Sequence, residues 1–110
     1  MPGLSIHVVD VSRGVVAAGM RVEVFFNNRK ILSGATSAKG ALEESAILEP
    51  GMYEAVLHVA EWYRVEKVPL PTVPFLDVVS YRFGIADPKQ HYHLPFKCTP
   101  WGYSCFRGGA

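Results

Sequence analysis

The sequence predicts an all-β fold, an antiparallel β-sandwich of about seven or eight short strands with one short helix. Short apolar runs recur at roughly 8–12-residue spacing, Gly, Pro and Asn residues separate them, and one segment suits a helix. The 110 residues are 49% hydrophobic and 19% charged, as in a folded globular chain. We expect a single domain over residues 1–110, because two cores of half this length would each be marginally stable.

The first half of the chain contains the clearest strand patterns. The first apolar run alternates and is rich in β-branched residues. The second run places Val22, Val24 and Phe26 on one face. Asn27 and Asn28 then tolerate left-handed backbone, which predicts a tight hairpin into the next strand. The strands expected in this half cover residues 4–10, 20–26, 29–33, 41–44 and 52–59.

The second half is expected to begin with the helix. Residues 59–68 are the one segment where a short helix is plausible, and prolines at positions 69, 71 and 74 exclude regular structure after it. Pro100-Trp101-Gly102 is a tight-turn signal that joins the last two strands into a hairpin. The strands expected in this half cover residues 76–83, 92–99 and 103–107.

Charge and hydropathy exclude several classes of partner. Eleven Lys and Arg residues against ten Asp and Glu residues give a net charge of +1, so we expect no nucleic-acid or anionic-membrane partner. The N-terminal residues contain no basic head followed by an apolar run, and no stretch reaches the roughly 20 apolar residues that span a bilayer. The expected protein is a soluble cytoplasmic domain.

The two cysteines are expected to be reduced thiols packed as small apolar residues. They are too few for a disulfide framework and lack a C-x-x-C spacing. A two-residue turn at Trp101-Gly102 would place Cys98 and Cys105 opposite each other across the last hairpin. Directly opposed Cβ atoms lie about 4.5–5.5 Å apart, further than the roughly 3.8 Å of a disulfide.

The histidines are the strongest candidates for chemistry. His91 and His93 are two residues apart in a predicted strand, so both imidazoles lie on one face. Three interpretations remain open: half-exposed strand residues without a role, general acid–base catalysis near neutral pH, or a metal site with His7 or His58 as a third ligand. No Cys or carboxylate lies at ligand spacing nearby. His7, in the first strand, would on its own be read as structural.

Arg107 is a candidate for binding. It is followed by two glycines near the end of the chain, so its planar guanidinium could be presented with little steric obstruction. The alternative is a frayed, solvated terminus.

Three stretches together resemble the transthyretin-related proteins that act as 5-hydroxyisourate hydrolases. LSIHVVD at residues 4–10 is similar to the family's L-S-x-H-V-L-D. HYHLP at 91–95 and TPWGYS at 99–104 are similar to H-Y-H-V-P and S-P-Y-G-Y-S. FRGG at 106–109 is similar to the terminal Y-R-G-S. The order and spacing agree from one end of the chain to the other.

The resemblance implies a transthyretin-like sandwich and a metal-free hydrolase. The family opens the ring amide of 5-hydroxyisourate, a purine-derived intermediate of urate oxidation, without a cofactor. It does so in a central channel of a homotetramer, a dimer of dimers. By position, the resemblance implies that His7 and His93 are catalytic and that Arg107, Phe106 and Gly108 bind the substrate.

Three departures from the family pattern leave a second function open. Ala41 stands where the family has an arginine, and Lys39 in the same turn would replace it only in part. Phe106 replaces the tyrosine of the terminal signature, and Gly109 replaces its serine, with Ala110 added. The alternative to a hydrolase is therefore a catalytically weak or silent transthyretin-like binding protein.

Overall fold

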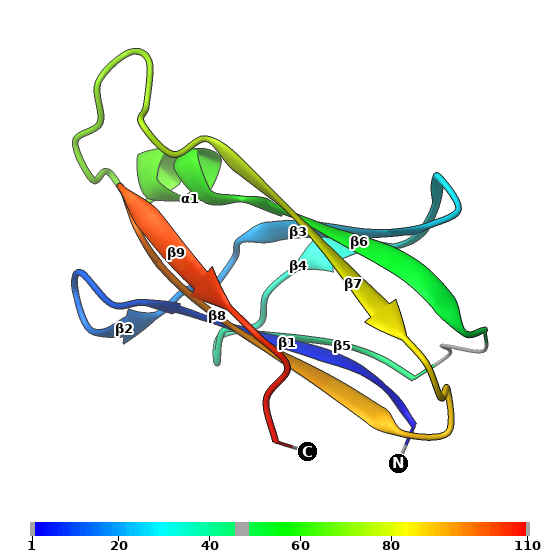
Figure 1. Cartoon of the computed structure of the whole chain (residues 1–110). Helices are drawn as coiled ribbons and strands as arrows, with labels where there is room; N and C mark the ends of the chain where they lie inside the picture. Colours follow the sequence, from blue (N-terminus) through cyan, green and yellow to red (C-terminus); the bar gives the residue numbers. More distant parts are fainter. Residues whose placement is uncertain (1, 46–48, 110) are drawn as a thin grey trace.

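The computed structural model describes residues 2–45 and 49–109 and shows two β-sheets that face each other, with one short helix between their ends (Figure 1). One sheet has the order β2-β1-β8-β9, with β5 also paired to β1, and the other has the order β4-β3-β6-β7. The elements are β1 (Gly3–Asp10), β2 (Val15–Val16), β3 (Arg21–Phe26), β4 (Arg29–Ala35), β5 (Ala41–Glu44), β6 (Gly51–His58), α1 (Val59–Val65), β7 (Val78–Ile85), β8 (His91–Thr99) and β9 (Gly102–Cys105).

The sandwich is confirmed, with one pairing that the sequence pattern did not predict. β1 and β8 run parallel along the whole of β1, and the other strand pairs are antiparallel. Parallel neighbours need a long connection instead of a hairpin. Here the segment that connects β1 to β8 contains all the strands of the other sheet. The two-residue β2 was not predicted either, because its exposed residues form no apolar pattern.

The local turns follow from residue type. Asn27 and Asn28 have φ angles of 52° and 61° and form the expected hairpin between β3 and β4. The helix ends at Val65, earlier than predicted, and Lys67 adopts a φ of 60° before the proline-rich segment. β7 begins at Val78, two residues later than predicted, and runs to Ile85.

The expected opposition of the two cysteines is wrong, because the turn lies one residue earlier than expected and the partner of Cys98 is therefore two residues earlier. Thr99 pairs with Gly102, so the turn residues are Pro100 and Trp101, and Cys98 lies opposite Tyr103 while Cys105 lies opposite Phe96. The Thr99 hydroxyl accepts hydrogen bonds from the backbone N–H groups of Trp101 and Gly102, at 3.0 and 3.1 Å, which fixes this turn. Both cysteines are free thiols. Burial raises the pKa of each to about 11.

The core lies between the inward faces of the two sheets and is closed at one end by α1. The helix buries Val59, Trp62 and Tyr63, which lie on one side at helical spacing. No helix among the described residues is long and apolar enough to cross a membrane. The other buried apolar side chains include Leu4, Ile6, Val8, Met20, Val22, Val24, Leu57, Ile85, Leu94 and Phe96.

A buried carboxylate ties the helix to the sheet. Asp10 is fully buried and accepts hydrogen bonds from the Ser12 backbone and hydroxyl, the Arg13 guanidinium and the Tyr63 hydroxyl. Burial alone would raise the pKa of Asp10, but these hydrogen bonds outweigh it and hold the pKa below its usual value. A group with a depressed pKa stabilises the fold above its unfolded-state pKa, and this contribution is lost as the pH falls through the folded-state value.

Tyr63→Phe is expected to lower the free energy of unfolding by about 1.5–3 kcal/mol at pH 7, the range for a hydrogen bond to a charged group. The matched control is Tyr53→Phe, because the Tyr53 hydroxyl donates to a neutral backbone carbonyl, that of Glu49. Its expected loss is about 0.5–1.5 kcal/mol and independent of pH. Urea unfolding of both variants measures the difference. The Tyr63→Phe deficit should shrink as the pH falls below about 4 toward the lowered folded-state pKa of Asp10, because a protonated Asp10 no longer offers the Tyr63 hydroxyl a charged acceptor; a deficit that stays constant down to pH 2 would contradict this account.

Candidate functional site

The candidate site lies on the outward face of β1 and β8, the parallel pair. In their register Ser5 lies opposite His93, and His7 lies opposite Pro95. Alternate residues of both strands point away from the core and are half-buried, which puts Ser5, His7, His91 and His93 on one surface. The expectation that His91 and His93 share a face is confirmed. The parallel pairing adds His7 and Ser5 to the same face.

Ser5 connects the two histidines of β8. Its Oγ lies 2.8 Å from Nε2 of His91 and 2.7 Å from Nδ1 of His93. Among the described residues nothing hydrogen-bonds to Nε2 of His93, so this nitrogen is available to a ligand. The sequence prediction did not identify Ser5 as a residue that contacts His91 and His93. Its spacing two residues before His7 in a strand was the signal that could have identified it.

His7 is held by the turn that precedes β5. Its Nε2 lies 2.9 Å from the carbonyl oxygen of Lys39. A carbonyl only accepts, so Nε2 carries a proton and neutral His7 has a bare Nδ1. The turn approaches β1 closely because position 40 is a glycine with a φ of 75°. A Cβ there would lie 2.7 Å from the Val8 carbonyl oxygen.

His93 is the histidine whose titration the surroundings shift most clearly. Burial lowers its pKa, and the nearby charges of His7 and His91, when protonated, lower it further. A main-chain hydrogen bond with Ser5 acts in the opposite direction but is the smaller effect. His93 is therefore neutral at pH 7, the form that can take a proton from water.

The terminal segment returns to the edge of β8 beside His93. The backbone N–H of Gly108 donates to the His93 carbonyl at 2.7 Å. A Cβ at position 108 would lie 2.8 Å from Cγ of Pro95 and 3.0 Å from Cδ2 of His93. Only a glycine fits against the histidine ring without displacement. Phe106 is 45% exposed, and its ring centroid lies 5.8 Å from Nζ of Lys97.

Arg107 is ordered by contacts at the beginning of β8. Its guanidinium carbon lies 4.0 Å from the centroid of the Tyr92 ring, and Nη2 donates to Oε1 of Gln90 at 3.1 Å and to the His91 carbonyl at 3.3 Å. The sequence left open a frayed terminus at Arg107, but in the structure these contacts hold the side chain in place. Within the described part of the chain, Arg107 makes no contact with the rings of His7 or His93. The structure thus places His7 and His93 on one face of the sheet, whereas Arg107 lies against Tyr92, a buried residue that points to the other face of β8.

Ala41 lies directly opposite His7 in the β1–β5 pairing. Opposed side chains of an antiparallel pair have Cβ atoms about 4.5–5.5 Å apart. A long side chain at this position would therefore reach over His7. Because position 41 is alanine, β5 provides no cation opposite His7.

His58 does not join the other histidines, so its suggested role as a third metal ligand is wrong. It lies at the end of β6 in the other sheet, where Nε2 is 2.8 Å from Oε1 of Glu23 and Nδ1 accepts from Arg21 at 3.2 Å. In the described residues there is no group of three or more His, Cys, Asp or Glu side chains that could hold a metal ion.

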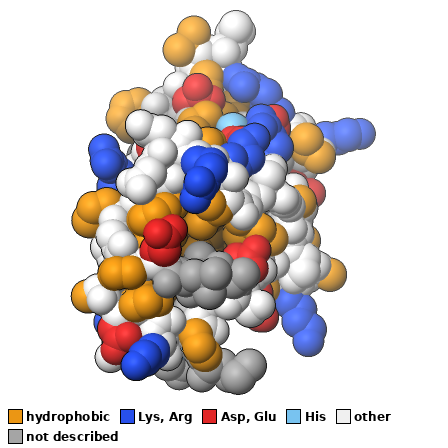
Figure 2. Space-filling view, turned by 90° about the vertical axis from the view of Figure 1, so that its right-hand side faces the viewer, with side chains coloured by type: hydrophobic (Ala, Val, Ile, Leu, Met, Phe, Trp, Pro, Cys, Tyr) orange, Lys and Arg blue, Asp and Glu red, His pale blue; other side chains and the backbone are white. Residues whose placement is uncertain are grey.

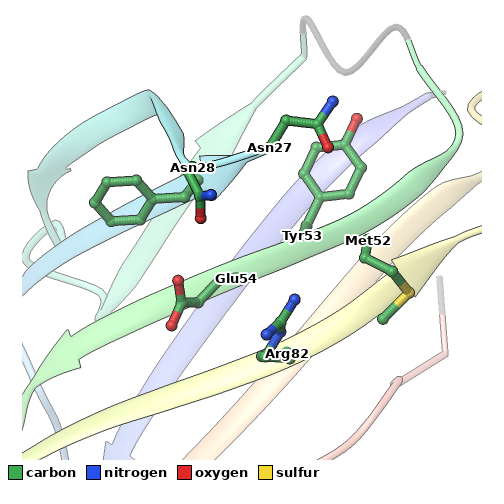
Figure 3. Close-up of a pocket in the computed structure, with 7 residues that line it drawn as sticks. Asn27, Asn28, Met52, Tyr53, Glu54 and Arg82 are labelled. Atoms are coloured by element: carbon green, nitrogen blue, oxygen red, sulfur yellow. The ribbon is translucent and has the colours of Figure 1, made fainter.

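The other sheet also contains a shallow hollow of about 180 Å³, at the β3–β4 hairpin. Figure 3 shows Arg82 and Glu54 on neighbouring strands and two asparagines from the hairpin around it. It contains no histidine and lies on a different sheet from the candidate site. The face in Figure 2 intersperses Lys and Arg side chains with Asp and Glu side chains, so no single-sign patch covers it. The labelled residues of the hollow are Asn27, Asn28, Met52, Tyr53, Glu54 and Arg82.

The fold and the site together define a two-sheet β-sandwich protein with a pair of histidines, His7 and His93, on the outside of one sheet. The chain belongs to the HIUase/Transthyretin family, whose model matches residues 4–108.

Comparison with individual proteins agrees with this assignment. The 5-hydroxyisourate hydrolase of Deinococcus radiodurans is 38% identical, over 97% of this chain and 96% of that protein. The structure of Klebsiella pneumoniae 5-hydroxyisourate hydrolase superposes with a TM-score of 0.86 at 27% identity and covers 99% of this chain and 100% of that one. The crystal structure of (S)-allantoin synthase gives a TM-score of 0.87 at 28% identity over 97% of this chain, which spans 43% of that longer chain.

Proposed function

We propose that this protein hydrolyses the ring amide of 5-hydroxyisourate in urate degradation. The observation that carries the proposal is the arrangement of His93, a neutral imidazole whose Nε2 faces outward beside His7 on one sheet face. Near-complete alignment with relatives named 5-hydroxyisourate hydrolase supports the choice of substrate, a small purine-derived molecule. The side chains named here supply the proposed chemistry without a cofactor.

In the proposed reaction His93 acts as the general base. Its Nε2 takes a proton from water while the water oxygen attacks the ring carbonyl carbon. The carbonyl becomes an oxyanion, and the bond between this carbon and the ring nitrogen then breaks. The ring nitrogen leaves with a proton, which the newly protonated His93 can return. The immediate products are a carboxylic acid and the ring nitrogen with its new proton. The acid then releases a proton to solvent and becomes a carboxylate, so atoms and charge balance.

His7 and Arg107 complete the proposed site. The Lys39 carbonyl fixes Nε2 of His7, so the ring presents Nδ1 to the same face. A protonated Nδ1 would donate to the developing oxyanion. Arg107 keeps guanidinium donors beyond those bonded to Gln90 and His91, and we assign it to substrate orientation together with Phe106 and Gly108.

One observation favours a second candidate, a catalytically weak or silent transthyretin-like binding protein. Ala41 lies opposite His7 where the resemblance implies an arginine, and loss of one oxyanion donor costs about 3–4 kcal/mol of transition-state stabilisation. The ultraviolet decay of freshly generated 5-hydroxyisourate separates the two candidates. A hydrolase present at a small fraction of the substrate concentration should accelerate the decay through many turnovers, whereas a silent binder should leave its rate unchanged.

A homotetramer, a dimer of dimers, is part of the proposal. β9 and β7 each form one edge of their sheets in the described structure, and β2, β5 and β4 lie at the opposite edges. Trp101, in the turn before β9, and Tyr103, on β9, are 68% and 48% exposed. Apolar side chains on an unpaired edge favour pairing with another chain. Assembly would also enclose the His93 face, which is open in the single chain.

We expect the wild-type protein to be a tetramer at micromolar concentration, and Tyr103→Lys to shift it toward smaller species because the new charge would be buried at the edge contact. Val73→Lys is the matched control, because Val73 is 81% exposed and lies on the proline-rich loop and not on β9. Sedimentation velocity measures both. A wild-type protein that remains a stable monomer would contradict the proposed channel.

We also propose a cytoplasmic location, which the two free thiols support, since a reducing compartment preserves such cysteines.

A further inference from the structure

The Ser5 hydroxyl lies between two imidazoles and can form hydrogen bonds to both of them in only two arrangements. It has one proton, so it donates to one ring nitrogen and accepts an N–H from the other. Both contacts are short, at 2.8 Å to Nε2 of His91 and 2.7 Å to Nδ1 of His93. The protonation states of the two histidines are therefore coupled through Ser5.

The two arrangements give His93 opposite chemical roles. In the first, Nδ1 of His93 donates to Ser5, Ser5 donates to Nε2 of His91, and neutral His93 has a bare Nε2. In the second, the directions reverse and neutral His93 has a proton on Nε2. Only the first arrangement leaves a base facing the substrate.

We infer that Ser5 and His91 are positioning residues that hold His93 with its proton on Nδ1 and relay positive charge away from it during the reaction. This inference rests on the proposed hydrolase function and deepens it. Neither residue needs to touch the substrate. Their action on His93 passes through the two hydrogen bonds to Oγ.

The relay balances in protons and charge. When water gives a proton to Nε2 of His93, the Nδ1 proton can pass to Oγ of Ser5 while the Oγ proton passes to Nε2 of His91. Ser5 is again a neutral hydroxyl, His93 is neutral with a proton on Nε2, and His91 carries the positive charge. Return of the Nε2 proton to the leaving ring nitrogen reverses each transfer. His93 can then act first as base and then as acid.

The backbone holds this arrangement in place. Ser5 and His93 are directly opposed in the parallel β1–β8 register, and the Gly108 N–H donates to the His93 carbonyl at 2.7 Å. The titratable groups that act on the His93 ring are His7 on β1 and His91 on β8. Two further charged groups belong to neighbouring segments: Glu43 on β5, and Arg107, which donates to the His91 carbonyl. Glu43 lies opposite Ser5 and is exposed.

The first test measures the tautomer directly and needs no substrate. In ¹⁵N-labelled wild-type protein above the His93 pKa, NMR should show the His93 proton on Nδ1. Ser5→Ala should shift the population toward Nε2–H, the form an unconstrained imidazole prefers, and Ser5→Thr should restore Nδ1–H because it keeps the hydroxyl. A wild-type His93 with its proton on Nε2, or a Ser5→Ala variant with an unchanged tautomer, would overturn the inference. The NMR measurement does not depend on turnover. It therefore tests the Ser5 arrangement even if the protein does not hydrolyse 5-hydroxyisourate.

The second test distinguishes two roles of His91: fixing the His93 tautomer through Ser5, and accepting positive charge from His93 during the reaction. In His91→Gln the amide oxygen can still accept from Ser5 but cannot take up a proton. This variant should keep the Nδ1–H tautomer, lower kcat by roughly 10-fold with little change in KM, and move the acidic limb of kcat/KM to higher pH, because the His91 charge that lowers the His93 pKa is gone. Wild-type kcat and an unmoved limb in His91→Gln would overturn the relay. If wild-type protein is inactive while the NMR result holds, the hydrolase proposal fails and the Ser5 arrangement remains.

Discussion

His93→Ala is expected to lower kcat/KM for 5-hydroxyisourate hydrolysis by about 10²-fold to 10⁴-fold, the usual contribution of a positioned acid–base group. The expectation follows from the geometry of the ring. Nδ1 is bonded to Ser5, Nε2 faces outward, and burial together with the charges of His7 and His91 keeps the pKa low. Among the described residues, no other imidazole on this face has its Nδ1 bonded to Ser5 and its Nε2 without a hydrogen-bond partner.

His58→Ala is the matched control for this prediction. His58 is half-buried like His93, but it lies in the other sheet and contacts Glu23 and Arg21. Its removal should leave kcat/KM within a factor of about two of wild type, since it touches no part of the site. Both variants are measured after sedimentation shows that they assemble as wild type does. Equal losses in the two variants would mean that His93 has no specific role.

The pH profile of the wild-type enzyme provides a further check on the same residue. A lowered pKa keeps His93 unprotonated below the ordinary imidazole value of about 6.5. The rate should therefore fall to half of its plateau at a pH below 6.5, as His93 gains a proton. A rate that is already half lost above pH 7 would contradict this assignment.

Ala41→Arg is expected to raise kcat/KM by up to about 10²-fold, the contribution of one positioned oxyanion donor. Position 41 is directly opposite His7, and its N–H and C=O belong to the β5 backbone, so the side chain can change without loss of the strand pairing. An arginine would extend over the His7 ring and bring a planar cation to the side of the site where β5 provides none.

Ala41→Met is the control for this gain. It adds a side chain of similar reach without charge, and it should leave kcat/KM near wild type or lower it by crowding. The ultraviolet decay assay compares the two variants at equal protein concentration. If Ala41→Arg and Ala41→Met behave alike, no negative charge develops near His7 in the transition state, and the proposed orientation of the substrate is wrong.

The parts of the fold that were predictable depend on local chemistry. Asn27 and Asn28 specify their hairpin through left-handed backbone, and the prolines after α1 exclude regular structure wherever the rest of the chain lies. The parallel pairing of β1 with β8 is different. It joins the two ends of the chain, so it depends on how the intervening sheet folds across the core, and no pattern within either strand encodes its direction.

The candidate site likewise has one part that local sequence predicts and one part that depends on long-range strand pairing. The shared face of His91 and His93 follows from their two-residue spacing, whereas the addition of Ser5 and His7 required the long-range register. The turn of the last hairpin lies one residue earlier than expected, which moves the partner of Cys98 by two residues. The Thr99 hydroxyl caps this turn, and the sequence Pro100-Trp101-Gly102 does not by itself decide between the two neighbouring turns. The position of Arg107 over Tyr92 depends on a terminal segment that has no strand pattern.

The most direct test of the account is the ultraviolet decay of freshly generated 5-hydroxyisourate followed in parallel with wild-type protein, with His93→Ala and with no protein. The account predicts rapid decay with wild type, through many turnovers per protein molecule, and decay close to the uncatalysed rate with His93→Ala. Three identical decays would show that the protein is a silent relative. A His93→Ala decay as fast as that of wild type, and faster than the protein-free sample, would show a hydrolase whose base lies elsewhere.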